Sequence, residues 1–68
     1  MPLITVDLWE GRDAQTKKRL AEEITNVVSN NIKCPDSAVM VIFRDVPMHN
    51  WAIGGKPCSE IFKDKVVK

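Results

Sequence analysis

The chain has 68 residues, enough for one domain with a marginal core, because a chain of this size buries only about 60% of the surface that its unfolded form exposes. A formal net charge of +1 excludes a long-range field that would attract nucleic acid or an anionic membrane. Cys34, Cys58 and His49 cannot form a zinc set or a disulfide framework, so no metal is expected. Oligomerisation is the remaining way to stabilise so small a domain.

The first predicted element is a strand over residues 3 to 9. Apolar and polar side chains alternate there, with Ile4, Val6 and Leu8 on one side, which is the period of a half-buried strand. The chain start has neither the basic segment nor the long apolar run of a secretory signal, and no stretch approaches the roughly 20 apolar residues of a membrane span. We therefore expect a cytoplasmic protein with reduced cysteines and no membrane partner.

The second predicted element is a helix over residues 14 to 33. Gly11 suits a turn, Asp13 is a good N-cap, and Pro35 ends the helix. Apolar side chains repeat at three and four residues and form one stripe, which consists of Leu20, Ala21, Ile24, Val27, Val28 and Ile32. Polar side chains fill the opposite face, namely Lys17, Lys18, Glu22, Glu23, Asn26 and Asn30.

A second strand follows over residues 39 to 43, and its apolar run lacks clean alternation, which indicates a strand covered on both faces. Strand, helix and strand in this order predict a right-handed crossover with parallel strands. The predicted fold class is therefore α+β, a single β-α-β unit completed by oligomerisation. Because one helix covers only one face of the sheet, we expect partner chains to cover the other face and the free strand edges.

The remainder of the chain has only short predicted elements. Residues 51 to 53 lie between turn signals and form a hairpin or pair with a neighbouring subunit. Residues 59 to 62 begin like a helical turn, and we expect the tail, about residues 57–68, to be partly frayed. No linker or repeat divides the chain, so residues 1–68 are expected to form a single domain.

The N-terminus carries a chemical signal. Methionine aminopeptidase removes Met1 when a small residue such as proline follows, and Pro2 would then present a secondary amine. A terminal amine titrates at about pH 8, and an apolar pocket disfavours its charged form, which produces a base suited to neutral pH. Taken alone, a Met-Pro start is better explained by a proline that merely begins an edge strand.

Several features together resemble the short 4-oxalocrotonate tautomerase family. They are the chain length, Pro2 directly before a strand, Leu-Trp-Glu-Gly-Arg at residues 8–12, the helix and second strand, and Trp-Ala-Ile-Gly-Gly at residues 51–55. The resemblance covers about residues 2 to 56. It implies the β-α-β fold of the tautomerase and macrophage migration inhibitory factor superfamily, assembled as a homohexamer, a trimer of dimers. It also implies an isomerase that needs no cofactor.

The resemblance further implies the site residues. Pro2 would be the catalytic base, which takes a proton from the hydroxyl of a carboxylated enol or dienol and returns it to carbon. Arg12 would bind the substrate carboxylate with its planar guanidinium, and Trp51 would form the apolar wall of the pocket. From the residues alone, Arg12 is instead a solvated turn arginine and Trp51 an interface or core tryptophan.

One position departs from the family pattern. The enzymes that give the family its name carry a second arginine near the start of strand two, contributed by a neighbouring subunit, and Met40 stands there. Arg44 lies roughly 13 Å further along an extended strand, too far to replace it directly. Loss of such a donor lowers rates on the order of 10² to 10³-fold. A monoacid, such as an arylpyruvate enol, therefore suits the predicted site better than a dicarboxylate.

Three alternatives remain open. The chain could be one subunit of a hetero-oligomer whose partner supplies the arginine missing at Met40. It could hydrate or dehalogenate an unsaturated acid, for which Glu10 or Asp7 would have to activate water. It could also be a binding module without activity, which requires a blocked N-terminus. His49 is expected at the surface or in an interface, and Gly54-Gly55-Lys56 lacks the P-loop pattern.

Overall fold

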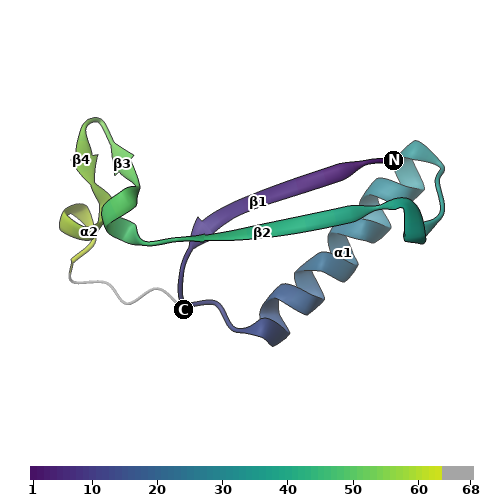
Figure 1. The fold of residues 1–68 in the computed structure, drawn as a ribbon, viewed down its shortest axis with the longest axis horizontal. Coiled ribbons are helices and arrows are strands. Elements are labelled where there is room, and N and C mark those ends of the chain that lie inside the picture. The colour runs from purple at the N-terminus through teal and green to yellow at the C-terminus, as the bar shows by residue number, and fades with distance from the viewer. Residues whose placement is uncertain (64–68) are drawn as a thin grey trace.

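A computed structural model of the chain describes residues 1–63. In chain order, the longer elements are β1 (Leu3–Trp9), α1 (Ala14–Ile32) and β2 (Met40–Val46). A short hairpin and a helical turn follow, namely β3 (Ala52–Ile53), β4 (Lys56–Pro57) and α2 (Cys58–Ile61). Two 3-10 turns, η1 (Asp36–Ala38) and η2 (Met48–Asn50), precede β2 and β3. Figure 1 shows the resulting arrangement, with the hairpin and α2 beyond one end of the long strands.

The predicted β-α-β unit with parallel strands is confirmed. β1 pairs with β2 in parallel over their full lengths, from Leu3 opposite Met40 to Trp9 opposite Val46. β2 is longer than predicted and extends beyond Phe43 to Val46. The parallel arrangement requires a long connection, and the 19-residue helix α1 provides it.

Local side-chain and backbone chemistry sets both ends of α1. The carboxylate of Asp13 accepts a hydrogen bond from the backbone N–H of Thr16 at 2.8 Å, which satisfies one of the free donors of the first turn. At the other end, Lys33 adopts a left-handed conformation with φ 68° and donates its N–H to the carbonyl of Ser29. Both ends agree with the predicted helix to within one residue.

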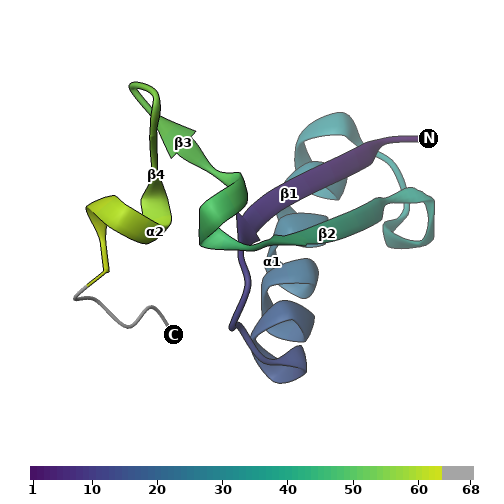
Figure 2. The same ribbon diagram turned by 60° about the vertical axis from the view of Figure 1, so that its left-hand side comes forward.

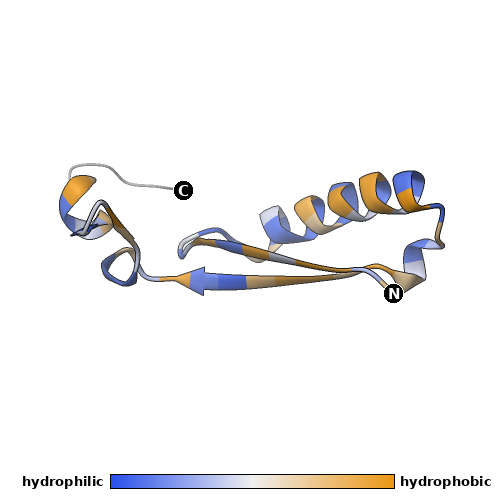
Figure 3. Ribbon diagram, turned by 90° about the horizontal axis from the view of Figure 1, so that it is seen from above, coloured by the Kyte–Doolittle hydropathy of each residue, from blue (hydrophilic) through white to orange (hydrophobic). Residues whose placement is uncertain are grey.

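Only part of the predicted apolar stripe of α1 faces the sheet. Ala21, Ile24 and Val28 are half-buried, whereas Val27 is 62% and Ile32 58% exposed. The stripe is therefore wider than a two-stranded sheet can cover. Figure 3 shows α1 lying over one face of the two strands, with hydrophobic residues on several of its turns.

The other sheet face carries alternate residues of both strands and is called the open face below. It consists of Leu3, Thr5, Asp7, Met40, Ile42 and Arg44, all of which are exposed. The exposure of β2 alternates, unlike the two-sided burial predicted from its sequence. The sequence does not show this alternation, because two of the exposed residues, Met40 and Ile42, are apolar. They are 46% and 44% exposed. No described element of the chain itself covers them.

Lys17 was predicted on the solvated face of the helix, and this was wrong. Its ammonium lies 2.6 Å from a carboxylate oxygen of Asp45 on β2, and its side chain is only 23% exposed. The ion pair links the first turn of the helix to the far end of the second strand. Because Asp45 is 45% exposed, we expect a contribution to stability below about 1 kcal/mol.

The hairpin and α2 form a second small cluster at the carboxyl end of β2. Gly54 and Gly55 both have positive φ, 60° and 83°, as a tight two-residue turn requires. The N–H of Cys58 donates to the carbonyl of Trp51 at 2.7 Å, and the Cys58 side chain is fully buried. The hairpin option is therefore confirmed. Figure 2 shows this cluster standing apart from α1.

The predicted fraying of the tail concerns residues 57–68. The described part includes the helical turn α2, which overlaps the predicted turn at residues 59–62. Residues 64–68 lie outside the described residues, so the fraying stays a prediction, as does the assignment of residues 1–68 to one domain.

The chain has almost no core of its own. Among the described residues, Cys58 is the one buried apolar residue and Ser29 the one buried polar residue. The radius of gyration is 14.9 Å, whereas a compact domain of this length has about 11 Å. The single chain therefore exposes surfaces that a stable domain buries.

The cap of α1 leads to a pH-dependent prediction. Hydrogen bonds from Thr16, through its side chain and then its backbone N–H, lower the pKa of Asp13 below its ordinary value of 3.8, and Arg19 adds a smaller effect. Because the folded pKa is depressed, the stabilisation is present above the unfolded value and is lost as the pH falls through the folded one. We expect the thermal midpoint of the wild type to fall more between pH 6 and pH 3 than that of Asp13→Asn.

Asn caps a helix about as well as Asp but does not titrate in this range, so Asp13→Asn is the matched control. Asp13→Ala should have a lower midpoint at both pH values. Parallel pH profiles for the wild type and Asp13→Asn, measured by circular dichroism, would contradict the role assigned to this carboxylate.

Candidate functional site

Pro2 lies at the beginning of the sheet, directly before β1. It is half-buried, and its carbonyl accepts a hydrogen bond from the N–H of Met40 at 3.0 Å. This bond continues the pairing of β1 with β2 and fixes the position of the proline backbone. Met1 is 87% exposed and projects from this end. The nitrogen of Pro2 therefore lies at an accessible chain end beside a rigid strand.

Arg12 lies just beyond the opposite end of β1. The N–H of Glu10 donates to the carbonyl of Val46 at 3.1 Å, and Gly11, with φ 120°, turns the chain towards Arg12. Arg12 is half-buried, and its Nη1 atom is buried without an acceptor on the chain. A buried guanidinium nitrogen without an acceptor is unfavourable unless an anion binds there.

Trp51 lies at the same end of the sheet as Arg12. It follows η2, where its N–H donates to the carbonyl of Met48, and it leads into β3. Its ring packs edge to face against Trp9, with 6.1 Å between ring centroids and 78° between planes. Trp9 is the last residue of β1, so the two tryptophan rings together form an aromatic surface near the turn that leads to Arg12.

A single chain does not bring the three predicted site residues together. Pro2 and Arg12 flank the seven residues of β1, which span roughly 23 Å at 3.3 Å per residue. Figure 1 shows the N-terminus at one end of the sheet and the β3–β4 hairpin at the other. Arg12 and Trp51 share one end, and Pro2 occupies the other.

Met40 lies beside Pro2 on the same chain. It is the first residue of β2, its side chain belongs to the open face, and it is 46% exposed. Arg44 lies further along the same face, opposite Asp7 in the strand register. The Pro2 end of the sheet therefore has an apolar surface around Leu3 and Met40.

The remaining polar candidates do not form a second site. Glu10, Asp7 and His49 are all exposed. In the part of the chain that the structure describes, no three His, Cys, Asp or Glu side chains group as metal ligands.

No helix within residues 1–63 is long and apolar enough to cross a membrane.

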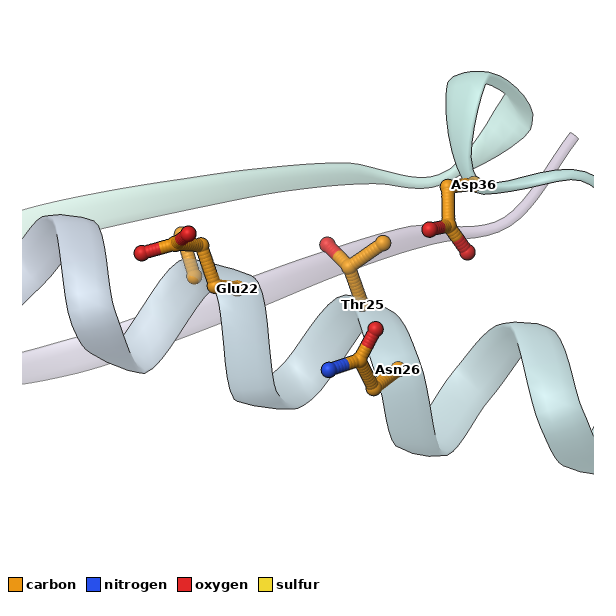
Figure 4. A pocket seen from close by; sticks show the side chains of 5 residues that line it. Glu22, Thr25, Asn26 and Asp36 are labelled. Atoms are coloured by element: carbon orange, nitrogen blue, oxygen red, sulfur yellow. The ribbon is translucent and has the colours of Figure 1, made fainter.

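Two shallow hollows of about 310 Å³ each lie along α1, and neither includes a predicted site residue. The polar hollow is shown in Figure 4, and its lining consists of Ala21, Glu22, Thr25, Asn26 and Asp36. The apolar hollow lies between α1 and the helix side of β1, and its lining consists of Ile4, Glu23, Ile24, Val27 and Val28. Both hollows are open to solvent, and the apolar one exposes a surface suited to a packing partner.

Trp9 was not predicted as a site residue. It belongs to the Leu-Trp-Glu-Gly-Arg motif on which the family resemblance rests. The structure shows that its indole Nε1 is buried without an acceptor, as is Nη1 of Arg12. The sequence offers one signal for this role. A tryptophan, whose indole N–H can donate a hydrogen bond, stands three residues before Arg12, with the turn residue Gly11 between them.

Comparison with known families identifies one match. The model of a family described as tautomerase enzyme matches residues 2–61, so the match begins at Pro2 and ends with α2. A probable tautomerase of Listeria innocua is 38% identical over 61 residues, which are 90% of this chain and all of that protein.

Solved structures of similar proteins agree with this match. A structure from work on the 4-oxalocrotonate tautomerase isozymes of Methylibium petroleiphilum has a TM-score of 0.83 and 32% identity, and covers 88% of this chain and 97% of its own. A heterohexameric 4-oxalocrotonate tautomerase from Chloroflexus aurantiacus has a TM-score of 0.84 and 28% identity, and covers 90% of this chain and 98% of its own. Both similarities cover about nine tenths of this chain.

Proposed function

The chain belongs to the tautomerase family, and from this premise we propose that it is a cofactor-independent keto–enol tautomerase acting on a carboxylated enol or dienol. The observation that supports a substrate with a carboxylate is the buried Nη1 of Arg12, which has no acceptor on the chain. The family match begins at Pro2, and the accessible Met1 before it supports exposure of the proline amine by an aminopeptidase.

In the proposed reaction, the neutral amine of Pro2 removes the proton from the enol hydroxyl. The electron pair of that O–H bond forms the new carbonyl, and the carbon–carbon double-bond electrons shift towards the carbon that will be protonated. The protonated amine then delivers the same proton to that carbon, so atoms and charge balance without a cofactor. Arg12 holds the carboxylate, and Trp51 forms an apolar wall that excludes water from the amine.

We propose that each site is built from more than one chain. Pro2 and Arg12 are separated by the length of β1, which is far longer than a small enol. A site containing both therefore takes Pro2 from one chain and Arg12 with Trp51 from another. The exposed apolar residues of the open face and of the hollow beside Val27 and Ile4 support such an assembly.

The proposed assembly is a homohexamer arranged as a trimer of dimers. The second candidate is a hetero-oligomer in which a partner chain supplies an arginine at the position of Met40. Met40 lies at the Pro2 end, and its apolar side chain supplies no charge there, which favours this candidate for a dicarboxylate substrate. The Chloroflexus relative, described as a heterohexamer, provides a precedent. The cytoplasmic localisation stays a prediction from the sequence.

The test of the proposed activity compares processed wild type, Pro2→Ala and a form that retains Met1. We expect the wild type to accelerate ketonisation of phenylenolpyruvate or 2-hydroxymuconate, followed by ultraviolet absorbance. Pro2→Ala should lose on the order of 10²-fold in kcat, because its primary amine replaces the positioned secondary one. The Met1 form should be inactive, since its Pro2 nitrogen is an amide.

Mass spectrometry of each preparation is the control for processing. Processed wild type that is no faster than buffer on both enols would refute the proposed function for these substrates. Equal rates for the wild type and the Met1 form would refute the role of Pro2.

Mixed oligomers test whether the site is shared. When Pro2→Ala and Arg12→Ala chains are coexpressed with different tags, random assembly should restore about a quarter of the wild-type activity, because only sites pairing one intact Pro2 with one intact Arg12 are complete. Sites within one chain would restore none.

The matched control coexpresses wild type with a chain carrying both substitutions. A shared site predicts about a quarter of the full activity there too, whereas a site within one chain predicts about half. Activity that stays at the background of the separate variants in the first mixture would exclude the shared site.

Met40→Arg tests the substrate class. We expect kcat/KM for the dicarboxylate 2-hydroxymuconate to rise on the order of 10²-fold, because a charge-stabilising donor is added near Pro2. The monoacid phenylenolpyruvate should change much less. Met40→Leu, which alters shape without adding charge, is the control. No gain for the dicarboxylate would show that position 40 lies outside the assembled site.

A further inference from the structure

Two buried hydrogen-bond donors near the end of β1 lack an acceptor. They are the indole Nε1 of Trp9 and Nη1 of Arg12, and they are the two buried side-chain polar atoms within residues 1–63 without a partner on the chain. Buried donors of this kind are rare in folded proteins, because each loses its hydrogen bonds to water on burial. Two of them within four residues of sequence indicate a place for an acceptor-rich group.

The position of Trp9 favours a ligand over accidental burial. It is the last residue of β1 and lies in register with Val46, while Arg12 follows after the turn at Gly11. Its ring is fixed by two aromatic contacts, with Trp51 at 6.1 Å and with Phe62 at 5.2 Å between centroids. A ring held in this way presents its N–H in one direction, so little conformational freedom is lost when an acceptor binds.

The chemistry of the two donors restricts the acceptor. An indole N–H donates and cannot accept, and a guanidinium only donates. A carboxylate offers two oxygens with about four acceptor sites, so it can take Arg12 and one further donor together. A neutral carbonyl would satisfy fewer donors and would leave the arginine charge unpaired.

We propose that Trp9 is a second carboxylate-binding residue, whose indole N–H donates to the same substrate carboxylate that Arg12 binds. This inference rests on the proposed function and adds a residue to its site. It assigns Trp9 to substrate binding and to the choice of acids over neutral enols, and leaves the proton transfer to Pro2. The occupant that competes with a substrate is a backbone or side-chain oxygen of a neighbouring chain.

The first measurement is made on processed, assembled wild type with ¹⁵N-labelled tryptophan. The chain has two tryptophans, so two indole N–H resonances are expected, and Trp9→Phe assigns them. The probe is 3-phenylpropionate, with its neutral methyl ester as the control. We expect the Trp9 indole proton to move downfield with the acid and to stay in place with the ester.

The second measurement uses Trp9→Phe, which retains a ring but removes the donor. We expect its Kd for 3-phenylpropionate to rise at least tenfold, with KM for phenylenolpyruvate rising in proportion and kcat nearly unchanged, because the carboxylate is held alike in ground and transition states. Affinity for the methyl ester should not change. Light scattering checks that the variant assembles as the wild type does.

The outcomes separate the two proposals. A wild type inactive on enols refutes the proposed function, yet a shift of the Trp9 resonance with 3-phenylpropionate still supports Trp9 as a carboxylate donor. An active wild type whose Trp9 resonance ignores the acid, or a Trp9→Phe variant with unchanged KM and Kd, overturns the inference and leaves the tautomerase proposal intact. If Trp9→Phe does not assemble, the wild-type resonance decides alone.

Discussion

A single helix can cover only one face of a two-stranded sheet, and this limit governs the rest of the molecule. α1 lies over the side that carries Ile4, Val6 and Leu8, while the open face keeps Leu3 and Ile42 exposed. The apolar stripe of α1 is also wider than the two-stranded sheet, so Val27 and Ile32 stay exposed. The described residues therefore expose apolar surface on both layers, and those between the layers are only half-buried.

The same geometry separates the proposed site residues. A strand that is paired along its whole length is rigid, so Pro2 and Arg12 are held apart at its two ends and cannot approach by bending of β1. In the proposed assembly, the same neighbouring chains cover the exposed apolar surfaces and complete the site. An apolar neighbour would also exclude water from the Pro2 amine, which links its basicity to assembly.

The two ends of the proposed site differ in how complete they are. The carboxylate end has Arg12 and an aromatic cluster, in which Trp9 contacts both Trp51 and Phe62. The Pro2 end has an apolar surface formed by Leu3 and Met40. A substrate with one carboxylate and an apolar remainder matches this asymmetry better than a dicarboxylate, unless a partner chain contributes a charge.

The order and limits of β1 and α1 and the parallel β-α-β connection follow from the sequence, because alternation, helical spacing and the Asp13 cap are local signals. The motif from Leu8 to Arg12 and the proline at position 2 already indicate the family in the sequence. The packing of α1 on the sheet is needed to tell which of its apolar residues stay exposed and that Lys17 pairs with Asp45. The three-dimensional structure supplies this information. It alone revealed the unpaired donors of Trp9 and Arg12. These depend on which surfaces the chain can cover with itself, and no local pattern encodes that.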